Sequence, residues 1–144
     1  MDVCCINRPF DDLSQDRVQF ESDAVLTILS HCKSEEWTLV SSEVMDLELA
    51  KLSNRERLNK VRMLCSISKE HLVLNEAVTE QAIEFQRCGI KVMDSLHLAV
   101  AEMHEIDVLL TTDDNFLRAA KRISTNITVA NPVFWLMEVL QHER

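Results

Sequence analysis

The chain alternates short apolar, β-favouring runs with longer stretches in which apolar residues recur at helical spacing. The apolar runs predict strands at 3–6, 37–41, 71–75, 107–112 and 127–131. The stretches between them predict helices over 15–33, 43–52, 55–68, 79–88, 93–105, 114–123 and 132–141. Strands that alternate with helices are typical of an α/β fold. We therefore expect three layers, α/β/α, with a mostly parallel central sheet of about five strands.

Residues at the ends of the predicted helices agree with these boundaries. Ser42 and Asn54 stand where each can cap the helix that follows. Gly89 is suited to a left-handed helix stop, and Pro132 is suited to the first turn of the last helix.

The size and composition of the chain predict one globular domain that spans residues 1–144. With 144 residues, 47% hydrophobic and 27% charged, the chain is long enough and apolar enough to bury a core. No apolar run reaches the roughly 18–20 residues that a membrane span needs, and the N-terminus has no signal-peptide pattern. We therefore expect no membrane partner and a cytoplasmic location.

Charge and glycine content exclude several classes of function. A net charge of −9 argues against a basic module that binds nucleic acid by covering its phosphates. It does not exclude an enzyme that meets phosphates through a bound cation. Gly89 is the only glycine, so neither a P-loop nor a glycine-rich dinucleotide turn is possible.

The five cysteines are predicted to be reduced, buried thiols. Their number is odd, and the adjacent Cys4 and Cys5 are poorly placed for a mutual disulfide. No cysteine or histidine spacing indicates a zinc site.

Acidic residues from separate segments are predicted to meet at one edge of the sheet. Ligands of open parallel α/β sheets gather at the carboxyl ends of the strands. The acids predicted to lie at that edge are Asp2, Glu43, Glu48, Asp94, Asp113 and Asp114. Carboxylates that crowd together raise one another's pKa, whereas Mg²⁺ or Mn²⁺ would be held by their oxygens and could activate water for phosphodiester hydrolysis.

Each of these acids also has a purely structural interpretation. Asp94 can be a favourable charge at a helix N-terminus, and Asp113 or Asp114 can cap a helix. Glu48 can be a solvated helix residue. His97, three residues after Asp94, is expected to pack or to form hydrogen bonds rather than to bind a metal.

The segment "MDSLHLAVAEMHEIDVLLTTDDNFL" resembles the C-terminal signature of PIN domains, small metal-dependent ribonucleases that include the VapC-type toxins. "SSEVMDLELAKL" is similar to the exit of the second strand in that family, and "DVCCINRPFDD" is similar to its opening segment. The resemblance implies a PIN-like fold, an RNA substrate and one or two Mg²⁺ or Mn²⁺ ions. It also implies an antitoxin partner and a homodimer.

Carried over by position, the family's acidic quartet falls on Asp2, Glu48, Asp94 and Asp113. These four residues are the predicted catalytic and metal-binding residues. Glu48 is preferred to Glu43 because it stands in the Glu-Leu pair of the helix. Asp113 is preferred to Asp114, which is expected to cap the next helix, because it holds the third place of "TTD".

The chain departs from the family pattern in two places. Only Met1 precedes the first aspartate, where relatives have four or five apolar residues that form the central strand. Cys4 stands where many relatives have asparagine. Either the first strand is shortened, with Asp2 close to a mobile terminus, or the natural start lies upstream of this chain.

Three functions remain open from the sequence. The first is a metal-dependent endoribonuclease, for which the basic stretch 51–62 is either a phosphate-steering flank or a solvated helix face. The second is a catalytically weak binding module of the same fold. The third is a phosphatase on a doubly wound sheet, but "MDVCCIN" lacks the paired aspartates that such an enzyme needs after its first strand.

Overall fold

A computed structural model describes residues 1–142 and confirms the α/β class with parallel strands. Eight α-helices, one 3-10 helix and four strands follow one another in these described residues. Their order is α1 (Val3–Ile6), η1 (Arg8–Phe10), α2 (Asp16–Lys33), β1 (Val40–Ser42), α3 (Glu43–Leu49), α4 (Arg55–Cys65), β2 (Glu70–Leu72), α5 (Glu76–Arg87), α6 (Val92–Met103), β3 (Val108–Leu110), α7 (Asp114–Lys121), β4 (Thr128–Ala130) and α8 (Pro132–His142).

The predicted sheet of about five strands is wrong. The structure has two parallel pairs instead, β1 with β2 and β3 with β4. Each of these strands is three residues long. They fall at the last four predicted positions, whereas the first predicted strand, 3–6, is helical.

Residues 3–6 form α1 because the start of the chain is capped as a helix. The Asp2 side chain accepts a hydrogen bond from the Cys5 N–H at 3.0 Å, as an N-cap residue does. Among residues 1–142, the backbone hydrogen bond from this segment to a strand comes from the residue before α1, since the Asp2 N–H donates to the Leu110 carbonyl at 3.1 Å. The intrinsic β preference of valine and isoleucine is weak without strand neighbours, so the cap decides this segment.

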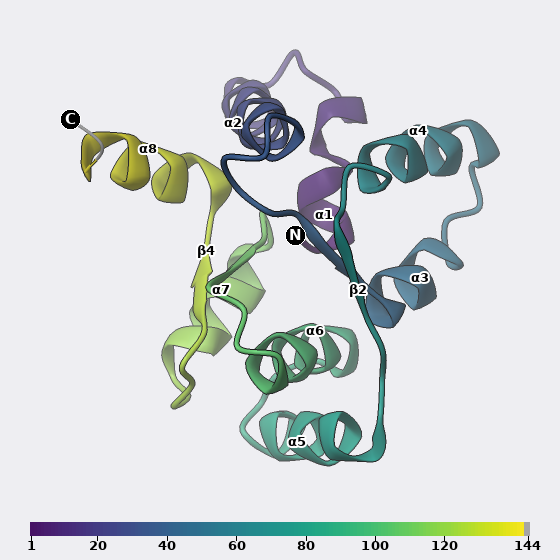
Figure 1. The fold of residues 1–144 in the computed structure, drawn as a ribbon, viewed down its shortest axis with the longest axis vertical. Helices are drawn as coiled ribbons and strands as arrows, with labels where there is room; N and C mark the ends of the chain where they lie inside the picture. The colour runs from purple at the N-terminus through teal and green to yellow at the C-terminus, as the bar shows by residue number, and fades with distance from the viewer. Residues whose placement is uncertain (143–144) are drawn as a thin grey trace.

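A cavity of about 110 Å³ separates the two strand pairs. Its lining includes all of β1 and β3, together with Met1, and it is closed by side chains of α2 and α6 such as Ile28 and Val100. Figure 1 shows the N-terminus at the centre of the molecule, between the β1/β2 pair and the β3/β4 pair. The cavity thus lies where a fifth, central strand would join the two pairs into one sheet.

Helices cover both faces of the strands. Leu109 packs in an apolar cluster with α5, α6 and α7, whereas the next residue, Leu110, packs in a second cluster with α2 and α8. Successive side chains of a strand point to opposite faces, so this split indicates a layer of strands between two layers of helices. In Figure 1, α5 and α6 lie on one side of the strands and α2 lies on the other.

The helix ends predicted from the sequence are confirmed at four positions. Ser42 caps α3 through the Met45 N–H, and Asn54 caps α4 through the Arg57 N–H. Gly89 has a φ of 97° just after α5, and Pro132 begins α8. These local signals place the helices that carry the acidic residues.

The cysteines are only partly as predicted. All five are free thiols, but Cys4 and Cys88 are exposed and Cys65 is half-buried, so only Cys5 and Cys32 are buried. Among residues 1–142, no helix is long and apolar enough to cross a membrane.

Candidate functional site

The charges of the four predicted acids all act on one side chain, the thiol of Cys4. The pKa of this thiol is raised to about 12, first by burial and then by the charges of Asp2, Glu48, Asp113 and Asp94. Four segments far apart in the sequence therefore bring negative charge to the same place. Cys4 itself reaches the surface at this point.

Asp2 is the most deeply buried member of the group, with 2% of its surface exposed. Its Oδ1 accepts from the Cys5 N–H, and its Oδ2 accepts from the Thr111 hydroxyl at 2.5 Å. Burial raises the pKa of Asp2 above the usual value, while His97 and these hydrogen bonds oppose the shift. Asp2 is therefore firmly held at the start of α1.

Glu48 is held by its neighbours on α6 and α1. Its Oε1 lies in a short contact with Nε2 of His97 and also accepts a weak bond from the Val3 N–H at 3.4 Å. His97 is 4% exposed and thus has the hydrogen-bonding role predicted for it. The alternative acid, Glu43, accepts from the Leu74 N–H at 2.8 Å and so supports the segment after β2.

Asp94 lies in the first turn of α6, half-buried, and makes no hydrogen bond to any residue that the structure describes. The pKa of its carboxyl is raised to about 6, first by burial and then by the charges of Asp2 and Asp113. Asp94 therefore carries a charge at neutral pH that nearby negative charge disfavours.

The prediction that Asp114 caps the helix after β3 is wrong, because the cap is Asp113. Asp113 is the N-cap of α7, and its Oδ1 accepts from the Asn115 and Phe116 N–H groups at 2.8 and 3.3 Å. Asp114 forms an exposed bidentate ion pair with Arg17, with both distances 2.7 Å. Capping engages only Oδ1 of Asp113, so its second oxygen remains available to a ligand.

Thr111 is a site residue that sequence reasoning missed. It is fully buried, its hydroxyl donates to Asp2, and the same oxygen accepts from the Asp113 N–H at 3.1 Å. Thr111 thus joins two acids that are far apart in the sequence. The signal was the first threonine of "TTD", because a buried hydroxyl beside an aspartate usually has a partner.

The donor chemistry of this site fits a hard divalent cation, but only part of the donor set is open. Among residues 1–142, no three histidine, cysteine, aspartate or glutamate side chains are arranged as a metal-binding group. Asp94, Oδ2 of Asp113 and Oε2 of Glu48 have no hydrogen-bond partner in the described residues. Oε1 of Glu48 is engaged by His97, and both oxygens of Asp2 are engaged, by the Cys5 N–H and by Thr111. Carboxylate oxygens are the ligands that Mg²⁺ and Mn²⁺ prefer.

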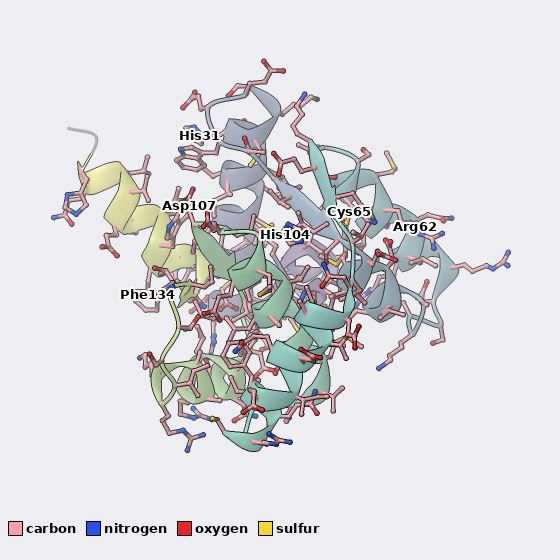
Figure 2. All side chains as sticks on the ribbon, turned by 60° about the horizontal axis from the view of Figure 1, so that its bottom comes forward. His31, Arg62, Cys65, His104, Asp107 and Phe134 are labelled. Atoms are coloured by element: carbon pink, nitrogen blue, oxygen red, sulfur yellow. The ribbon has the colours of Figure 1, made fainter. Side chains whose placement is uncertain are left out.

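Two of the five basic residues in the stretch 51–62 form ion pairs within the fold. Both of these residues lie on α4. Arg57 pairs with Asp11 at 3.1 Å, and Lys60 pairs with Glu56 of the same helix at 3.3 Å. Figure 2 shows Arg62 of α4 on the opposite side of the molecule from α7, and Figure 1 shows the same separation of the two helices.

A comparison with family models matches residues 20–122 to the PIN domain. The matched part contains α3, α6, β3 and α7, and with them Glu48, Asp94 and Asp113. No curated protein and no solved structure matches the chain significantly.

Proposed function

The chain belongs to the PIN domain family, whose members are generally nucleases that use divalent metal ions, and from this premise we propose that it is an endoribonuclease. In this proposal Mg²⁺ or Mn²⁺ is held by Asp2, Glu48, Asp94 and Asp113. The products are two shorter RNA strands.

The observation that carries the proposal is the charge balance at Asp94. This carboxyl has a pKa raised to about 6, no ion pair with any cation among the described residues, and two acidic neighbours, Asp2 and Asp113, that contribute to the shift. A fold that needed only stability would gain from asparagine here. An uncompensated carboxylate group is typical of a site that is completed by a cation.

The residues of the chain have separate tasks in this proposal. Asp94 and Asp113 offer open oxygens to the cation, and Thr111 and the α7 backbone hold Asp2 and Asp113 in place. His97 keeps the Glu48 carboxylate close to Asp2. A bound divalent cation supplies electrostatic stabilisation of the phosphoryl oxygens and lowers the pKa of water.

The experiment that tests the proposal is a calorimetric titration with Mn²⁺ of the unaltered chain, Asp94→Asn and a matched control, Asp107→Asn. Asp107 is exposed and precedes β3, whereas Asp113 follows it, so the control removes one charge at the other end of the same strand. We expect binding by the unaltered chain and the control, and loss of at least about 10-fold in affinity in Asp94→Asn. Cleavage of a single-stranded RNA should follow the same order. Equal Mn²⁺ binding in all three would contradict the proposed site.

A second candidate is a catalytically weak binding module. The observation that favours it is the engagement of Asp2 and Glu48 by protein groups, together with the lack of a preformed metal-binding group among residues 1–142. In that case neither Mn²⁺ binding nor RNA cleavage would be found with the unaltered chain.

We also propose that the chain forms a homodimer, and that as the toxin of a toxin–antitoxin pair it is inhibited by an antitoxin that inserts a basic side chain into the acidic site. The homodimer is supported by exposed apolar side chains on α2 and α8, of which Phe20 is 62% and Phe134 is 75% exposed. Figure 2 shows Phe134 pointing outward from α8. Light scattering of the unaltered chain and of Phe134→Ser tests the dimer, and co-purification from the source cells tests the antitoxin.

A further inference from the structure

Two hollows in the surface flank the first turn of α7, and each contains one acid of the site. The first is about 200 Å³ and includes Asp94, Lys91 and Arg122 in its lining. The second is about 530 Å³ and includes Asp113 and Arg17. Arg118 lines both hollows. A ligand that crosses the acidic site would therefore pass along α7 from one hollow to the other.

Two cations of the second hollow, Arg8 and Arg17, are already neutralised. Arg17 pairs with Asp114 and with the buried Glu21, and Arg8 pairs with Glu21 at 2.8 Å and with Asp11 at 3.1 Å. These ion pairs join α2 to η1 and to the first turn of α7. Because Arg8 and Arg17 are paired within the fold, Arg118, which the second hollow shares with the first, is the one cation of the second hollow without an ion pair in the described residues.

The cations of the first hollow are free within the part of the chain that the structure describes. Lys91, Arg118 and Arg122 are all exposed, and none lies within 4.0 Å of a carboxylate of residues 1–142. The one contact of Arg118 is with a neutral oxygen, because its guanidinium donates to the Asn115 side chain. Three unpaired positive charges thus stand beside Asp94 in a chain whose net charge is −9.

We propose that Lys91, Arg118 and Arg122 form a phosphate-binding subsite that holds the RNA backbone next to the phosphodiester at Asp94 and Asp113. The inference rests on the proposed function and assigns the side from which the strand enters the site. An acidic protein repels RNA at long range, so a local group of unpaired cations beside the cleavage site is needed to offset that repulsion. The geometry favours a backbone over a free base, because the hollow offers charged donors and no exposed aromatic ring.

The test is RNA binding and cleavage by Arg118→Gln, Arg122→Gln and Lys91→Gln, with Arg62→Gln as the matched control. Arg62 is also an exposed helix cation, but it lies on α4, away from α7 (Figure 2). The probe is a fluorescein-labelled, mixed-sequence single-stranded RNA of about 12 nucleotides, followed by anisotropy in EDTA over a range of KCl concentrations. KM and kcat are then measured with Mn²⁺.

We expect each subsite substitution to weaken RNA binding about 3- to 10-fold and to reduce the salt slope by about 0.7, the value for one lost contact to a single strand. KM should rise by a similar factor with little change in kcat, and Mn²⁺ affinity should stay the same. The control should match the unaltered chain in every measurement. Circular dichroism checks that each variant is folded.

The outcomes separate this inference from the proposed function. Cleavage with unchanged KM and RNA affinity in the subsite variants overturns the subsite and leaves the nuclease standing. RNA binding that depends on the three cations, without cleavage, supports the subsite and overturns the nuclease. No RNA binding by the unaltered chain, in EDTA or with Mn²⁺, overturns both.

Discussion

The two halves of the acidic site are held in different ways. Asp94 and Asp113 stand at the starts of α6 and α7, with open oxygens and few hydrogen bonds beyond the α7 cap. Asp2 stands in a one-turn N-terminal segment, but both of its oxygens are bonded and it is almost fully buried. Asp94 and Asp113, on the longer helices, thus keep oxygens that a ligand can reach. Asp2, in the short N-terminal segment, has no free oxygen.

This difference indicates that the two parts of the site affect the stability of the fold in opposite ways. The interactions of Asp2 stabilise the fold, because they join α1 to the residue after β3. Those of Asp94 destabilise it, because burial and neighbouring charges disfavour its ionised form. Functional sites often retain such unfavourable charges. Substitutions of Asp94 or Asp113 should therefore change activity more than stability, whereas substitutions of Asp2 should change stability more than activity.

The largest expected effect is on activity, at Asp113. Asparagine is as good a helix cap as aspartate, so Asp113→Asn should keep the cap of α7 and change the free energy of unfolding by less than about 0.5 kcal/mol. It removes one of the open charges, so RNA cleavage with Mn²⁺ should fall by about 100-fold or more. Asp113→Ala should lose the same activity and about 1 kcal/mol of stability as well. Cleavage rates and urea unfolding measure the two effects, and retained cleavage in Asp113→Asn would remove Asp113 from the site.

The next effect is on stability, at Asp2. Asp2→Ala removes the acceptor for the Thr111 hydroxyl and for the Cys5 N–H, both of which are buried. We expect a loss of about 2–4 kcal/mol in urea unfolding, because buried donors are left without partners. Thr111→Val, which removes the hydroxyl and keeps the shape, should cost less than Asp2→Ala. Equal stability of Asp2→Ala and the unaltered chain would show that the N-terminal segment is not held as the structure has it.

A smaller effect is expected from filling the cavity between the strand pairs. The variant carries the tripeptide Val-Ile-Val directly before Met1 and is released from a cleavable tag. The tripeptide has the same length as β1 and β3, which are three residues each. It would place apolar side chains and backbone groups against both strands, and we expect a gain of about 1–3 kcal/mol from the buried apolar area. Ser-Asn-Ser at the same position is the control. Equal unfolding midpoints for both extensions would show that the cavity does not accept a strand.

The smallest effect is a pH dependence of stability caused by Asp94. Its folded pKa of about 6 lies above the unfolded value of 3.8, so ionisation costs stability in the folded state. The cost is absent below about pH 4, grows as the pH rises through about 6 and is complete above it. In EDTA, Asp94→Asn should therefore be more stable than the unaltered chain at pH 7.5, by about 1 kcal/mol after allowance for its solvent exposure, and equal to it near pH 4. Thermal unfolding at the two pH values measures this, and a difference that is the same at both would contradict the assigned cause.

Local signals in the sequence determined most of the helices and their ends. Ser42, Asn54, Gly89 and Pro132 stand where the structure uses them, because capping and turn conformations depend on only a few neighbouring residues. The last four strands were also predicted at the right places. The hydrogen-bonding role of His97 was predicted as well, whereas the preference for Glu48 over Glu43 as a metal ligand stays a prediction.

Only the tertiary structure decided the rest, and each case involves partners that are distant in the sequence. Residues 3–6 have the composition of a strand, but a strand needs neighbours on its edges, and the Asp2 cap makes this segment helical instead. Asp113 and Asp114 are both suitable caps, and Asp114 is drawn away by Arg17, 97 residues earlier. The sequence by itself determined which acids this protein has and where its helices begin. The fold alone decided which of these acids are bonded and which remain open to a ligand, because burial and long-range hydrogen bonds depend on three-dimensional packing.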